Sequence, residues 1–537
     1  MTEQVRNIAP RTAAHIDRAS FDETPPIFRS VLFPSDPEES LAAKSPPECF
    51  VDLHLDQIVA GIVAKRDEEV LRPIFYTTFR DEDIIHHRLA VFGDLERPDV
   101  FSPFPEFCEA MQTVRENFAY AGKIDRKCHH GMVFLHAVSL YCEAVATLLE
   151  RLQALTLQSD GLNSLRAYLA DYTRSSSFIN LATETRNLQD IVSKIRYGTL
   201  FRGDKVTVRK YASESDYTVT ILDRFAKFRE GTVDHLKLER PKTDTFSLNH
   251  IEEGILEFVG RLFPEEFSTL ADFVARHSGF IDDVIARFDR EIGFFVAYLA
   301  FIAPLKQAGL PFCHPEVSAS SKETDVSSSF DLALALKLTA EKSAVVLNSF
   351  HLSGPERLLV VSGPNQGGKT TFARMFGQLH FLAGLGCPVP GTHARLFLSD
   401  HVFTHFEREE AITNLRGKLE DELVRLHQTC QTMTSHSVIV LNEIFNSTSL
   451  DDQIFLSTKM LEQILAADTI GVCVTFIDAL STLSKKTVSM VSTVGAGDPA
   501  RRTFEIVRKP ADGLAYALSL AERRGVTYEQ LRTRVRP

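Results

Sequence analysis

The sequence predicts a multidomain α plus α/β protein: a mostly helical half, then an α/β domain of the P-loop, ABC-like type. Helical periodicity dominates from residue 51 to 312, and short apolar runs alternate with helical segments after residue 331. A glycine-rich loop, GPNQGGKT (363–370), lies between one such run and a helical segment. With 537 residues, the chain can bury the cores of two or three domains.

The composition is that of an ordinary soluble protein, with 44% hydrophobic and 24% charged residues. Its formal net charge of -12 argues against general attraction to nucleic acid, so contact with a polyanion would need a local basic patch. The N-terminus mixes both charge signs and lacks the apolar core of a signal peptide. The apolar stretch 292–305 is too short to span a membrane and predicts a buried helix. We therefore expect a cytoplasmic protein without membrane contact.

The first 47 residues are proline-rich with few periodic runs, which predicts an extended N-terminal arm (1–47). Residues 48–312 form the helical half, with clear helical patterns at 55–71, 132–155 and 252–263. Two alternating runs, KVTVR (205–209) and YTVTI (217–221), interrupt it. They are separated by a polar turn and predict a β-hairpin near 205–221.

The serine-rich segment 313–330 predicts a polar linker or a long surface loop. Beyond it, residues 331–537 contain three wholly apolar runs, RLLVVSG (357–363), HSVIVLNE (436–443) and IGVCVTF (470–476). Strands that are apolar on both faces suit a parallel sheet covered by helices on both sides. The eight cysteines are scattered without a CxxC pair, so we predict no metal site from them.

The loop at 363–370 predicts a phosphate-binding site. Glycines let the backbone N–H groups turn toward phosphates, the following helix adds the positive end of its dipole, Lys369 reaches the terminal phosphates, and Thr370 offers a hydroxyl to Mg²⁺. The alternative is an ordinary tight turn. The sequence predicts ATP rather than guanine nucleotide, because no NKxD-type segment follows. The candidate nucleotide-binding residues are Gly363, Pro364, Asn365, Gln366, Gly367, Gly368, Lys369, Thr370, Thr371 and Asn442.

The ATPase half resembles the MutS mismatch-repair superfamily, whose loop reads GPNMGGKST. Here the loop is GPNQGGKTT, and LAGLGCPVPGTHARLFLSDHVFTHF (382–406) is similar to the family's LAxIGxxVPA and DxIFTR segments. NEIFNSTSLDD (442–452) corresponds to DEIGRGTSTxDG, and GLAYALSLAERRGV (513–526) is similar to the final helical region. The likeness covers about 345–530 and is looser over 50–312.

The resemblance implies a helical core and lever domain, ATP with Mg²⁺ in composite sites of a homodimer, a C-terminal helical dimerisation segment, and a DNA partner, double-stranded or branched. Mismatch readers carry an N-terminal recognition domain with a Phe-x-Glu wedge, and a connector domain. This chain is expected to lack both. Phe104-Pro105-Glu106 fits the tripeptide but lies in the helical half, so mismatch reading is not predicted.

Three departures from the family affect the chemistry. Asn442 replaces the aspartate that holds Mg²⁺, often through water, so a weaker metal contact and slow hydrolysis are expected. Phe476 replaces a histidine that faces the terminal phosphate. In the segment 415–423, Lys418 is a candidate for the partner subunit's site, with a solvent-facing charge as the alternative.

Glu443 and Lys369 are the catalytic candidates. Glu443 would orient or deprotonate the attacking water, or alternatively cap the next turn. Around the predicted hairpin lie basic residues that could contact DNA phosphates, with a solvated strand face as the alternative: Lys194, Arg196, Arg202, Lys205, Arg209 and Lys210.

Two functions remain open from the sequence. The first is a DNA-associated ATPase, a dimer that couples ATP binding and slow hydrolysis to clamping on DNA without reading mismatches. The second is a nucleotide-gated binding or scaffold protein with little or no hydrolysis. Retention of Lys369, Thr370 and Glu443 favours the first.

Overall fold

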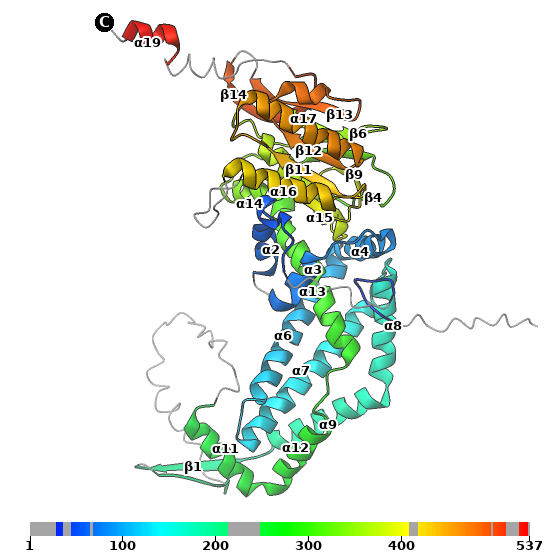
Figure 1. Ribbon diagram of the computed structural model, residues 1–537. Helices are drawn as coiled ribbons and strands as arrows, with labels where there is room; N and C mark the ends of the chain where they lie inside the picture. The colour runs from blue at the N-terminus through cyan, green and yellow to red at the C-terminus, as the bar shows by residue number, and fades with distance from the viewer. Residues whose placement is uncertain are drawn as a thin grey trace, which may run out of the picture.

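The computed structural model describes residues 28–35, 45–64, 68–203, 205–212, 248–407, 417–495, 498–511 and 526–534. The α/β part lies at one end of an elongated molecule, and long helices lead away from it to a small hairpin at the other end (Figure 1). The molecule is a mixture of helices and sheets, as the sequence predicts, with a multistranded and largely parallel sheet in the C-terminal part.

Twelve described helices build the N-terminal part. They are α1 (Cys49–Asp52), α2 (Leu55–Val63), α3 (Glu68–Tyr76), α4 (Glu82–Leu95), α5 (Pro98–Phe101), α6 (Pro103–Ala121), α7 (Lys127–Gln153), α8 (Asp160–Arg174), α9 (Ser176–Ser193), α11 (His250–Leu262), α12 (Pro264–Arg276) and α13 (Asp283–Gln307). Side-chain caps start several of them. Ser159 and Ser175 accept backbone N–H groups at α8 and α9, and Asn249 with Glu252 forms a capping box at α11.

The predicted buried helix at 292–305 is confirmed as part of α13. Its aromatic residues Phe294, Phe295 and Tyr298 are fully buried, and Phe92 of α4 packs against all three rings. Among the described residues, α7 is the helix whose length and apolar composition would suffice to cross a membrane, but most of its apolar window is buried against neighbouring elements. Core helices commonly have this character.

Part of the proline-rich N-terminal segment is packed into the core. Of residues 1–47, positions 28–35 and 45–47 are described. Val31 and Leu32 are fully buried, and Glu291 of α13 accepts hydrogen bonds from Ser30 Oγ (2.7 Å) and from the Val31 N–H (2.9 Å). The prediction of an extended arm therefore needs correction at 28–33, where apolar side chains anchor the chain.

The hairpin consists of β1 (Tyr197–Arg202) and β2 (Lys205–Lys210), paired antiparallel. The strand predicted at 205–209 is confirmed, but the partner that the structure shows for it precedes it in the sequence. Gly203, with a φ of 61°, lies in the short connection between the paired Arg202 and Lys205. The other predicted strand, 217–221, lies outside the described residues.

The segment 313–330 is a structural part of the C-terminal domain and not a linker. It contains β4 (Glu316–Ser318) and β5 (Thr324–Ser329), which join β6 (Asn348–Leu352) and β9 (His393–Phe397) in a sheet of order β4-β9-β5-β6. The short β3 (Phe312–Cys313) pairs with β8 (Val389–Pro390). Thr324, Val326 and Ser329 are buried, so β5 points two small polar side chains as well as an apolar one into the protein interior.

The main sheet has six strands in the order β10-β11-β12-β7-β13-β14. These are β7 (Leu358–Ser362), β10 (Val402–His405), β11 (Val438–Asn442), β12 (Ile470–Val474), β13 (Thr487–Gly495) and β14 (Asp498–Arg508). All pairings except β13–β14 are parallel. The strands predicted from the three apolar runs are therefore confirmed.

Helices cover this sheet, as the apolar runs predict. On one face, α15 (Lys369–Gly384) packs against β11 and β12, and on the other face α16 (Lys418–Thr432) and α17 (Leu450–Ala466) share a core with the strands. The 3-10 turn η1 (Asp478–Thr482) contacts β7 and β13, α14 (Leu332–Ala340) packs against α2, α13 and α15, and the final helix α19 (Tyr528–Arg534) lies apart from the sheet (Figure 1). Side chains of β7 alternate between two cores: Leu359 and Val361 pack in one, and Leu358 and Val360 in the other. The segment 513–525 of the predicted dimerisation region lies outside the described residues.

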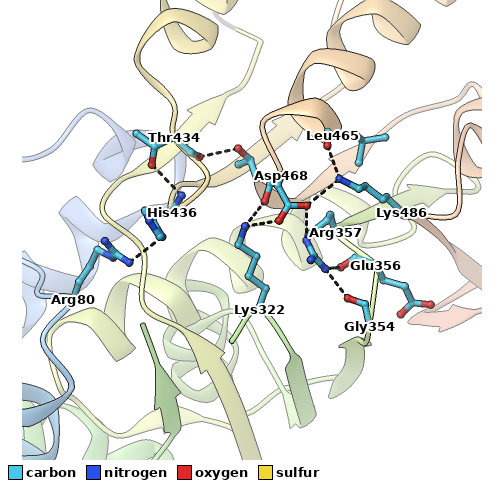
Figure 2. A network of polar contacts seen from close by, with 11 residues as sticks. Arg80, Lys322, Gly354, Glu356, Arg357, Thr434, His436, Leu465, Asp468 and Lys486 are labelled. Atoms are coloured by element: carbon cyan, nitrogen blue, oxygen red, sulfur yellow. Dashed lines mark hydrogen bonds and ion pairs between the residues drawn. The ribbon is translucent and has the colours of Figure 1, made fainter. Parts of the chain in front are cut away.

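A four-residue ionic cluster ties the two sheets together at the edge where the parallel strands begin (Figure 2). Asp468, just before β12, binds Lys322 from the β4–β5 loop (2.7 Å), Arg357 before β7 (3.0 Å) and Lys486 before β13 (2.9 Å). Burial alone would raise the pKa of Asp468, but the hydrogen bonds from these three cations hold its pKa well below the usual range. The carboxylate therefore stays charged at any pH near neutrality.

Candidate nucleotide-binding site

The glycine-rich loop follows β7 at the carboxyl edge of the parallel strands and leads directly into α15, which begins at Lys369. Gly363 and Gly368 have φ angles of 120° and 89°, and Gln366 also adopts a left-handed conformation. A Cβ atom at Gly367 would lie 2.3 Å from Ser492 Oγ. The loop therefore needs its glycines, and its position at a helix N-terminus suits an anion such as phosphate.

Two side chains from β13 and β14 hold the loop from the side. Ser492 Oγ donates to the Gly367 carbonyl at 2.7 Å, and Arg502 Nε donates to the Asn365 carbonyl at 3.0 Å. Neither residue was predicted from the sequence, because each lies more than a hundred positions from the loop and only the strand order brings it there.

Lys369 is buried and lies across the loop. Its Nζ donates to the carbonyls of Gly363 and Pro364, both at 3.0 Å, and lies 4.3 Å from the centre of the Phe476 ring. Burial lowers the pKa of Lys369, Glu443 opposes this shift, and Arg502 adds to it. A cation–π contact of this kind contributes on the order of 1 kcal/mol. The ammonium group is thus held at the place where a phosphate chain would need a positive charge.

Thr370 and Asn442 form the candidate metal position. Thr370 Oγ1 donates to Asn442 Oδ1 at 3.0 Å, and Asn442 is buried at the end of β11. A hydroxyl and an amide oxygen are hard donors of the kind that Mg²⁺ accepts beside water and phosphate oxygens. The pair therefore fits a magnesium ion but contributes no negative charge to it.

Glu443 lies in the turn that follows β11, and β11 is the strand adjacent to β12. Its φ is 55°, its N–H donates to the Val474 carbonyl at 2.9 Å, and Asn446 Nδ2 donates to its Oε2 at 3.3 Å. The Glu443 side chain is half-buried, and its negative charge acts to raise the pKa of Lys369. A carboxylate so placed can orient or deprotonate a water molecule.

The other candidate nucleotide-binding residues lie close to these groups because they are neighbours of the loop glycines in the sequence. Pro364, Asn365 and Gln366 lie in the loop, and Thr371 lies in the first turn of α15. Lys418 starts α16 and forms an ion pair with Glu407 of the same chain. The structure therefore pairs Lys418 with a carboxylate of its own chain.

The six basic candidates for DNA contact lie at the far end of the molecule, on and beside the hairpin (Figure 1). Residues paired across the two strands share a face of the hairpin. The register pairs Arg202 with Lys205 and Gly198 with Arg209, so Arg202, Lys205 and Arg209 lie on the same face. Lys210 belongs to the opposite side and lies over the ring of Phe263, 4.9 Å from its centre. Lys194 and Arg196 are exposed in the segment that leads into β1.

Comparison with known proteins identifies the region that contains this site. Residues 359–521 match the family model of MutS domain V. The chain is 29% identical over 189 residues to endonuclease MutS2 of Thermus thermophilus, covering 35% of this chain and 25% of that protein. It is 30% identical over 165 residues to the DNA mismatch repair protein MutS of Shouchella clausii, covering 29% of this chain and 19% of that one. The match thus spans a quarter or less of these relatives.

Proposed function

The chain belongs to the MutS superfamily, and from this premise we propose that it is a DNA-associated ATPase of the cytoplasm that binds ATP with Mg²⁺ and hydrolyses it slowly. The observation that carries the proposal is the meeting of Lys369, Thr370, Asn442 and Glu443 at one edge of the sheet. These groups are the minimum for phosphoryl transfer to water: a cation for the phosphates, oxygens for the metal and a carboxylate for the nucleophile.

Each residue has a distinct task in this proposal. The loop N–H groups and Lys369 bind the phosphate chain, and Thr370 and Asn442 hold Mg²⁺, which neutralises phosphate charge when bound. Glu443 orients the attacking water and accepts its proton. Phe476 is 47% exposed and covers the lysine with an apolar ring that offers no hydrogen bond to the nucleotide.

Slow hydrolysis follows from Asn442. A charged hydrogen bond contributes about 1.5 to 3 kcal/mol and a neutral one about 1 kcal/mol, so the missing charge lowers turnover or Mg²⁺ affinity by roughly three- to thirtyfold. The same residue and Phe476 favour a second candidate function, a nucleotide-gated binding or scaffold protein that hardly hydrolyses ATP. Steady-state ATP turnover with and without Mg²⁺ separates the two, because the second candidate predicts nucleotide binding without phosphate release.

We further propose that two copies of the chain act together and that their helical halves close around DNA. The support is the family's composite site and the distance along the molecule between the sheet and the hairpin (Figure 1). Sedimentation with and without ATP tests the pairing. A strict monomer in both states would contradict a shared site.

Reversing two charges on the hairpin, Lys205→Glu with Arg209→Glu, is expected to weaken retention on duplex DNA by tenfold or more at low salt, because both residues lie on the face that also contains Arg202. The slope of log affinity against log salt concentration should also become shallower by about two, one for each lost phosphate contact. Filter binding or fluorescence anisotropy over a salt series measures both.

The matched control reverses two exposed lysines of the ATPase domain, Lys337→Glu with Lys342→Glu, which changes the net charge by the same amount. Equal losses in the two double variants would show that only overall charge matters. Absence of any DNA retention by the unchanged protein, at low salt with ATP, would contradict a DNA partner.

A further inference from the structure

A buried carboxylate outside the nucleotide site connects three elements through one oxygen atom. Glu422 of α16 is 8% exposed, and its Oε1 accepts a hydrogen bond from the backbone N–H of Phe445 at 2.7 Å. His405 Nε2, at the end of β10, lies 3.1 Å from the same oxygen, and His405 is 3% exposed. Glu422 thereby links α16 and β10 to the turn that follows β11.

That turn contains the catalytic candidate Glu443 and is held in an unusual conformation. Glu443 and Phe445 both have left-handed φ angles, 55° and 59°, although neither is glycine. Such conformations cost free energy and persist where the surroundings hold them. Phe445 is 2% exposed, so its N–H needs a partner inside the protein, and Glu422 supplies that partner.

A second set of contacts holds the other side of the turn. Gln453 of α17 donates through Nε2 to the Ile444 carbonyl at 3.0 Å and to Asn446 Oδ1 at 2.6 Å. Asn446 in turn donates to Glu443 Oε2 at 3.3 Å. Asn446 therefore holds the carboxylate of Glu443, and Glu422 holds the backbone of the turn at Phe445, two residues after Glu443.

We infer that Glu422 is a positioning residue for ATP hydrolysis: by binding the Phe445 N–H it keeps Glu443 aimed at the attacking water, without itself touching nucleotide. This inference rests on the proposed ATPase function. Losing the contact lets the turn relax toward ordinary φ angles and shifts the Glu443 carboxylate. A shift of about 1 Å at a catalytic group can lower the rate up to about a hundredfold.

The test compares Glu422→Ala, Glu422→Gln and a control on the same helix, Glu420→Ala, whose side chain is exposed. The Gln oxygen can still accept the Phe445 N–H, so we expect Glu422→Gln to keep turnover within about threefold of the unchanged protein, while Glu422→Ala loses tenfold or more. The dissociation constant for ATP–Mg²⁺, measured with a fluorescent ATP analogue, should change less than about threefold in all three.

A purely structural role predicts a different pattern. Loss of affinity and turnover to the same extent in Glu422→Ala, or no rescue by Glu422→Gln, would overturn the inference. Amide hydrogen exchange of the peptide 442–449 is followed in the same samples, since it does not depend on hydrolysis. If the unchanged protein shows no turnover, the ATPase proposal fails, and unchanged exchange in Glu422→Ala would then also refute the positioning contact.

Discussion

Replacing Glu443 by Gln is expected to lower ATP turnover by about a hundredfold or more, because a positioned general base typically contributes a factor of 10² to 10⁴. The amide keeps the size of the side chain and its contact with Asn446, but it cannot accept a proton from water. ATP binding should change little, since the phosphates are held by the loop and by Lys369.

Single-turnover cleavage of labelled ATP, beside equilibrium binding, measures both effects. Glu341→Gln, an exposed carboxylate of the same domain, is the matched control and should behave as the unchanged protein. If Glu443→Gln hydrolysed ATP at the unchanged rate, another group would have to act on the water. The role assigned to the turn after β11 would then be wrong.

Replacing Lys369 by Ala is expected to weaken ATP binding by about ten- to a hundredfold and to remove measurable turnover. The charged hydrogen bonds that Nζ would give to phosphate contribute about 1.5 to 3 kcal/mol. The buried ammonium already makes two contacts to loop carbonyls and one to the Phe476 ring, so the variant also loosens the loop.

Titration calorimetry with ATP–Mg²⁺ measures the affinity, and Lys337→Ala removes an exposed lysine of the same domain as the control. An unchanged affinity in Lys369→Ala would contradict phosphate binding at this loop. A parallel loss in the control would instead indicate a general effect of charge.

The sequence predicted those parts of the fold whose signals are local. The apolar runs at 358–362, 438–442 and 470–474 identified the central strands, because side chains buried on both faces leave no polar positions. The pairing of β1 with β2 was missed because strand alternation at 217–221 outweighed the short turn signal Gly203–Asp204. Residues 324–329 (TDVSSS) were too polar to suggest an interior strand, yet they pair with both β6 and β9.

The same distinction applies to the site. Lys369, Thr370, Asn442 and Glu443 belong to contiguous motifs, and the strand order places them at one edge of the sheet. Ser492, Arg502 and Glu422 are ordinary residues in ordinary sequence contexts, and their contacts with the loop and the turn depend on long-range packing. No local pattern distinguishes such residues before the fold is known.

We expect this site to hydrolyse ATP, and we expect Asn442 to make that hydrolysis slow. The most direct test is Mg²⁺-dependent ATP turnover of the unchanged protein beside Asn442→Asp, each with and without Glu443→Gln. We predict slow turnover that rises about three- to thirtyfold in Asn442→Asp and disappears when Glu443→Gln is added. Tight ATP binding with no hydrolysis in the unchanged protein and none in Asn442→Asp would contradict the claim and leave a nucleotide-gated switch.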